Sequence, residues 1–135
     1  MALFGNLGKY KNTGIFIIRV GLGIMFIFHG YHKLISGPKS WEMVGTSTKY
    51  IGIHFLPVVW GFLAAAVETF GGFLLIIGLA FRPVCLLLII NLIVAAFYHF
   101  GTGSGLDGAA HAIEDAIMFA GLLFVGPGKY SFDKK

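Results

Sequence analysis

The chain has very few charged residues and a single cysteine. Asp, Glu, Lys and Arg make up 12% of its 135 residues, too few to cover the surface of a soluble domain. The lone Cys85 excludes an intrachain disulfide, a CxxC redox pair and a cysteine metal site. No basic stripe alternates with aromatic residues, so the sequence gives no basis for binding nucleic acid. Hydrophobic residues instead make up 57% of the chain, which predicts an integral membrane protein.

Four apolar segments are each long enough to cross a hydrocarbon core of about 30 Å. They cover residues 14–35, 53–81, 84–100 and 109–125. Ser36-Gly37-Pro38, Arg82-Pro83 and the glycine-rich residues 101–105 separate them, as expected of helix breaks. The sequence therefore predicts an all-α fold, a single domain of residues 1–135 that forms a transmembrane four-helix bundle.

The connections and the small residues add detail to this prediction. Residues 36–50 are expected to form an interfacial loop with a short amphipathic turn held by Trp41 and Met43. Small residues inside the segments allow helix backbones to approach closely in lipid, which predicts packing contacts. The glycines concerned are Gly21, Gly23, Gly61, Gly71, Gly72 and Gly121.

The distribution of positive charge predicts the orientation. An even number of spans places both termini on one side of the membrane. That side carries Lys9, Lys11, Arg82, Lys129, Lys134 and Lys135, whereas the other carries Lys33, Lys39 and Lys49. Because positive residues are enriched on the cytoplasmic side, we predict cytoplasmic termini and a multi-pass protein of the inner (plasma) membrane.

Ionisable residues within membrane spans are functional candidates because burying them in lipid is costly. With a rise of about 1.5 Å per residue, three ionisable residues and one asparagine lie roughly 8–16 Å from the cytoplasmic helix ends. These are Arg19, Glu68, Asn91 and Asp115. The simplest expectation is a buried network in which Arg19 neutralises Glu68 or Asp115 and Asn91 adds hydrogen bonds. The alternative is that the network only fixes helix packing.

A second polar layer is predicted near the outer surface. His29, His99 and His111 lie at one depth, roughly 21–24 Å from the cytoplasmic side, and Glu114 lies a few Å below them. Such a group can bind a metal, ligate haem, or hydrogen-bond a quinone head group and exchange protons with it. The metal prediction is weak because no HxxxH pair accompanies these residues. Interfacial histidines also commonly only cap or snorkel, so this alternative stays open.

Three stretches resemble the DoxX family of small four-helix membrane proteins. Residues 19–34 read RVGLGIMFIFHGYHKL, similar to the family's R-x-G-L-G opening and its H-G-x-x-K-L. Residues 68–79 read ETFGGFLLIIGL, similar to its E-x-x-G-G-x-L-L-x-x-G-L, and residues 126–133 read GPGKYSFD, similar to its C-terminal G-P-G-R/K-Y-S-x-D. The resemblance implies a role in membrane redox chemistry, since relatives occur as the small subunit of a thiosulfate:quinone oxidoreductase. The matched Arg19, His29, Lys33 and Glu68 become candidate site residues, and Lys33 joins the residues expected to bind a cofactor.

Two functions remain open from the sequence. In the first, the protein is a small membrane subunit of, or accessory to, a quinone-linked oxidoreductase, and the outer histidine layer contacts the quinone. In the second, it is a non-catalytic structural or assembly subunit of a larger membrane complex. Its expected partners are membrane lipids and a larger complex or further copies of itself. Quinone is the expected cofactor, with haem or metal left open.

Overall fold

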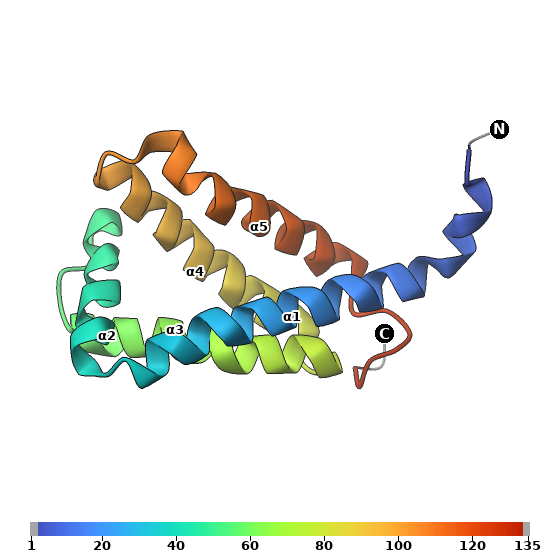
Figure 1. Ribbon diagram of the computed structural model, residues 1–135, viewed down its shortest axis with the longest axis horizontal. Coiled ribbons are helices and arrows are strands. Elements are labelled where there is room, and N and C mark those ends of the chain that lie inside the picture. The colour runs from blue at the N-terminus through green and yellow to red at the C-terminus, as the bar shows by residue number, and fades with distance from the viewer. Residues whose placement is uncertain (1–2, 134–135) are drawn as a thin grey trace.

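The computed structural model describes residues 3–133, and all the regular secondary structure in them is helical (Figure 1). The helices are η1 (Gly5–Tyr10), α1 (Lys11–Ile35), α2 (Pro38–Gly45), η2 (Thr46–Ile51), α3 (Pro57–Ile77), α4 (Phe81–Gly101) and α5 (Gly105–Val125). Four segments, namely Gly5–Ile35, α3, α4 and α5, are long and apolar enough to cross a membrane. The predicted all-α fold with four spanning helices is confirmed. Lys134 and Lys135, which contribute to the predicted orientation, lie outside the described residues.

The second span is shorter than the sequence pattern predicts. Instead of 53–81, α3 begins at Pro57 and ends at Ile77. Gly78 follows with φ +72°, a left-handed conformation that glycine adopts without steric cost, and its N–H donates to the carbonyls of Leu74 and Leu75. Hydropathy alone does not detect this helix end because the residues after Gly78 are also apolar.

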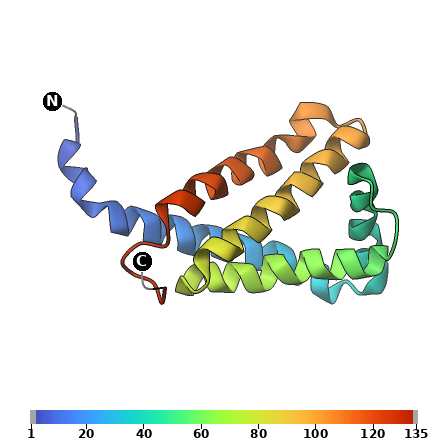
Figure 2. The same cartoon turned by 180° about the vertical axis from the view of Figure 1, so that it is seen from behind.

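The four long helices form two pairs. α1 packs along α3, and α4 packs along α5. The pairs lie close together near the α3–α4 turn and diverge towards the opposite end, as both views show (Figures 1 and 2). We call the first end the tail end, because residues 126–133 lie there, and the other the α2 end. An edge-to-face contact between Phe26 of α1 and Phe119 of α5, with ring centroids 5.4 Å apart, joins the two pairs.

The segment expected to be a loop with one turn is helical over most of its length. α2 and η2 cross the α2 end and pack against α3, and η2 also contacts α4. Trp41 faces inward, with its ring 5.0 Å from that of Phe62 and its Nε1 donating to the Lys33 carbonyl at 3.0 Å. Met43 is exposed, so only Trp41 of the two predicted anchors packs against the helices.

Glycines set how closely the helices approach. A Cβ at Gly23 of α1 or Gly72 of α3 would clash with the backbone of the facing helix, and a Cβ at Gly61 would lie even closer to the Trp41 backbone of α2. The predicted packing role therefore holds for these positions. Gly21 and Gly121 face open space instead, which in this fold corresponds to the lipid side.

Candidate functional site

A charged pair with an amide beside it lies between α1, α3 and α4. Lys33 Nζ donates to both carboxylate oxygens of Glu68 at 3.0 Å, and Asn91 Nδ2 donates to Glu68 Oε2 at 2.9 Å. Glu68 is buried, and its side chain is 9% exposed. The pair has no net charge, which lowers the cost of placing it within the membrane.

The geometry of α1 explains why Lys33 reaches Glu68. Lys33 lies in the last turn of α1, whereas Glu68 lies roughly 16 Å along α3 from its first residue. Side chains on an α-helix lean towards its N-terminus. Lys33 therefore leans from the α2 end towards the middle of the bundle, and its four-carbon stem carries the ammonium to the carboxylate.

These residues border a cavity of about 400 Å³ between α3, α4 and η2. Its walls are mostly aliphatic, and its polar groups come from a few side chains. The lining residues are Lys33, Val44, Gly45, Ser47, Thr48, Ile51, Ile53, Trp60, Leu63, Ala64, Val67, Glu68, Leu87, Ile90, Asn91, Leu92, Val94 and Ala95. A mostly apolar cavity with a few polar groups is the usual form of a site for a small organic molecule.

Hydrogen-bonding capacity remains unused around this cavity. The Nε1 of Trp60 is buried, with no hydrogen-bond partner among the described residues. Asn91 donates one amide hydrogen to Glu68. Within residues 3–133 the Oδ1 of Asn91 accepts no hydrogen bond. Buried polar groups are normally paired, so an unpaired one beside a cavity indicates a ligand or water there. Trp60 and Glu68 lie roughly 12 Å apart along α3, which gives the cavity polar groups at two levels.

Arg19 does not take part in this network. Its guanidinium donates to the carbonyls of Leu75, Ile76, Pro127 and Tyr130 at 2.7–2.9 Å. The expectation that Arg19 neutralises Glu68 or Asp115 is thus corrected. The reason is again the lean of helical side chains, which directs Arg19 towards the N-terminal end of α1 and away from the middle of the bundle. There it binds backbone carbonyls at the C-terminal end of α3 and in the tail.

Asp115 contacts a histidine on its own helix. Its Oδ2 lies 3.4 Å from Nε2 of His111, one turn away on α5. The His111 side chain is 77% exposed and Glu114 is exposed. This part of the predicted outer layer therefore faces away from the cavity lined by Glu68.

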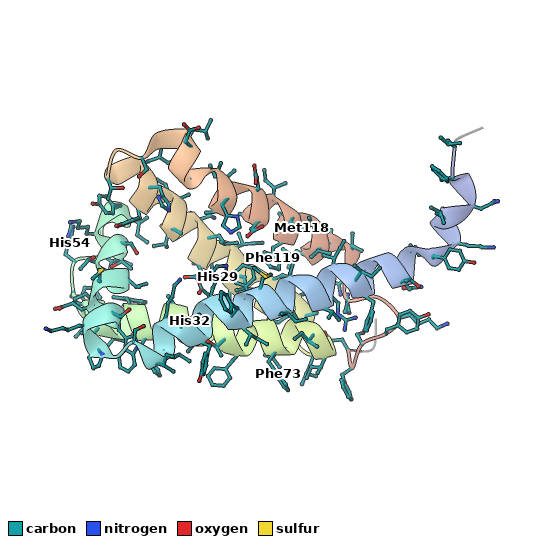
Figure 3. The ribbon with its side chains drawn as sticks, viewed as in Figure 1. His29, His32, His54, Phe73, Met118 and Phe119 are labelled. Carbon is teal, nitrogen blue, oxygen red and sulfur yellow. The ribbon has the colours of Figure 1, made fainter. Side chains whose placement is uncertain are left out.

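The remaining histidines are spread over the molecule. His29 is exposed on α1, where its ring lies against Phe28 at 5.8 Å. Figure 3 shows His29 and His32 on α1 and His54 apart from them at the α2 end. His99 is partly buried on α4, with its Nδ1 buried and unpartnered within the described chain. Residues 3–133 contain no group of three or more His, Cys, Asp or Glu side chains that could hold a metal ion.

Sequence reasoning missed Trp60 as part of the site. Tryptophan in an apolar span is usually a packing residue, and only the three-dimensional structure reveals that its N–H has no partner among residues 3–133. The position of Lys33 could have been read from the sequence. A lysine in the last turn of a helix leans towards the middle of that helix, and the next span carries a glutamate near its middle. Together these two features indicate an ion pair between Lys33 and Glu68.

Comparison with known proteins gives two matches. A model of the DoxX family matches residues 14–101, which include all three residues of the charged network. An uncharacterized protein of Haemophilus influenzae (strain ATCC 51907 / DSM 11121 / KW20 / Rd) is 29% identical over 136 aligned positions that cover 96% of each chain. No solved structure matches the chain.

Proposed function

The chain belongs to the DoxX family of membrane proteins, and from this premise we propose that it binds a quinone head group in the cavity bordered by Lys33, Glu68 and Asn91. The observation that carries the proposal is the intramembrane charged network beside an apolar cavity with unused hydrogen-bonding groups. In this view the protein is a small membrane subunit of, or accessory to, a quinone-linked redox assembly.

The residues of the cavity fit a quinone head group. A quinone presents a flat apolar ring with two carbonyl oxygens that accept hydrogen bonds. The aliphatic side chains of Leu63, Val67 and Ile90 supply the apolar contact, and a cavity of about 400 Å³ accommodates a substituted ring. The unpaired Trp60 N–H supplies a donor away from the charged pair. When bound, a quinone would exchange electrons and protons with a redox partner.

Each polar residue has a distinct role in this proposal. Lys33 has three N–H donors, of which two contact Glu68, so the third can donate to a quinone carbonyl. Asn91 holds the Glu68 carboxylate and can turn its free amide atoms towards the ligand. Glu68 is the group that can accept a proton or release one to the ligand. The paired ammonium keeps that carboxylate in place.

Within residues 3–133 only the short helices η1, α2 and η2 and the tail accompany the four long helices, which supports a role within a larger assembly. We propose that the electrons come from a partner protein in the inner membrane. The same architecture fits the alternative of a structural subunit, and quinone binding distinguishes the two.

The test is calorimetric titration of the purified protein in lipid nanodiscs with a short-chain ubiquinone. We expect saturable binding that Trp60→Phe weakens by roughly tenfold, since this change removes one hydrogen bond and little else. Asn91→Leu should weaken it further. The matched control is His111→Ala, because the His111 side chain faces away from the cavity. This variant should bind the quinone as tightly as the unchanged protein does.

Other outcomes would redirect the proposal. Loss of binding in His99→Ala and His111→Ala, with Trp60→Phe unaffected, would place the quinone at the outer histidine layer. Absence of binding in the unchanged protein, together with loss of a partner complex when the protein is deleted, would identify a structural subunit.

A further inference from the structure

A second cavity, of about 660 Å³, lies at the tail end of the molecule, far from Lys33 and Glu68. It lies between the start of α1, the start of α4 and the segment that follows α5. Its lining residues are Lys11, Asn12, Ile15, Arg82, Val125, Pro127, Gly128, Lys129, Ser131, Phe132 and Asp133. The proposed quinone site uses none of them.

The tail that forms one wall of this cavity is held in place at several points. The Lys129 N–H donates to Asn12 Oδ1 at 3.0 Å, and Arg19 binds the Pro127 and Tyr130 carbonyls. Further along, the Phe132 N–H donates to the Ile77 carbonyl at 3.0 Å. Figure 2 shows the tail passing from the end of α5 to the region of the α3–α4 turn. The cavity is therefore a formed feature of the fold.

The charge around the cavity is positive. Lys11, Arg82 and Lys129 contribute three positive charges, against one negative charge from Asp133. Both oxygens of Asp133 accept N–H groups at the start of α4, from Ala80 at 2.8 Å and from Phe81 at 2.7 Å. Asp133 thus acts as a cap for α4. Within residues 3–133, neither Lys11 nor Lys129 has a carboxylate at ion-pair distance.

The cavity also has an apolar wall and lies beside the ends of several candidate membrane spans. Ile15, Val125 and Phe132 line it beside the cationic groups. Since α3, α4 and α5 begin or end at this level, it coincides with one boundary of the spanning segments. Cationic groups beside apolar side chains at the end of a membrane span are the arrangement that an anionic phospholipid matches.

We propose that this cavity binds the phosphate of an anionic phospholipid, with Lys11 and Lys129 as its principal contacts and with the glycerol backbone against Ile15 and Val125. Bound in this way, the lipid would join α1 to the tail. The proposal does not depend on quinone binding, because it rests on residues at the opposite end of the bundle.

The experiment is native mass spectrometry of the full chain released from detergent micelles, with phosphatidylglycerol and phosphatidylcholine offered in equal amounts. We expect the protein to retain phosphatidylglycerol preferentially. The double variant Lys11→Gln/Lys129→Gln should reduce this binding roughly thirtyfold, since each cation near an anionic lipid favours its binding by about fivefold and the two factors multiply. Lys39→Gln/Lys49→Gln removes two lysines at the α2 end and is the matched control.

Each alternative result contradicts the proposal. Equal loss in both double variants would mean that the protein attracts anionic lipid only through its overall charge. Equal retention of phosphatidylcholine would mean that the cavity does not select for negative charge. Displacement of the lipid by millimolar inorganic phosphate would assign the site to free phosphate.

Discussion

At the scale of single residues, the direction in which long side chains lean decides the chemistry of α1. Arg19 and Lys33 lie on the same helix, and both lean towards its N-terminus. For Arg19 this direction leads to carbonyls at the tail end, and for Lys33 it leads to the carboxylate of Glu68. One cation therefore caps the end of a helix and the other forms an ion pair in the interior.

The Lys33–Glu68 pair predicts a characteristic pattern of stability. Removal of one partner leaves a charge within the membrane without compensation, so Lys33→Met and Glu68→Gln should each destabilise the fold by about 3–5 kcal/mol. The double variant should lose much less stability than the sum of the losses in the two single variants. Unfolding of the three variants in detergent measures this coupling, with Lys39→Met as the control. Additive losses would indicate that the two residues do not interact.

At the scale of helices, glycine contacts decide where α2 lies. The backbone of Trp41 in α2 meets α3 at Gly61, where a Cβ has no room. Because α2 and η2 cover the α2 end of the first cavity, their position also sets its shape.

Gly61→Ala is therefore expected to push α2 away from α3. It should lower the free energy of unfolding by roughly 1–3 kcal/mol, the usual cost of overpacking, and should weaken ligand binding in the first cavity. Gly21→Ala is the matched control, because its Cβ would meet open space and alanine favours the helix. Thermal unfolding in detergent measures the stability of both variants. Equal melting temperatures would show that α2 does not depend on this contact.

At the scale of the whole molecule, the two ends of the bundle differ. At the tail end, α1, α3, α4 and the tail are joined by Arg19 and Asp133. Towards the α2 end the helix pairs diverge, and this is where the first cavity lies (Figure 1).

The substitution Arg19→Lys tests whether the contacts of Arg19 are needed to hold the tail at the tail end of the molecule. Lysine keeps the charge but lacks the planar fork that binds carbonyls on two segments at once. We expect the tail to detach for a larger fraction of the time, so trypsin should cleave after Lys129 several times faster. A protein with Lys9→Gln, a change outside these contacts, is the control. Unchanged cleavage in Arg19→Lys would show that other contacts are sufficient to hold the tail.

Some features of this protein could be predicted from the sequence alone. The four spanning helices follow from runs of apolar residues, because backbone groups in lipid must be hydrogen-bonded within a helix. The depths of Glu68 and Asn91 follow from the rise per residue, and these two side chains do meet. The DoxX resemblance also rests on the sequence, and the family match supports it.

The tertiary structure alone decided which polar residues share a site. The rotation of each helix about its axis places His29 and His111 outward and Glu68 inward, and periodicity is too weak to fix that rotation when nearly every residue of a span is apolar. Equal depth thus does not imply contact. The partner of Glu68, the buried position of the Trp60 N–H and the basic cavity at the tail depend on contacts between segments far apart in the chain, which only the folded protein brings together.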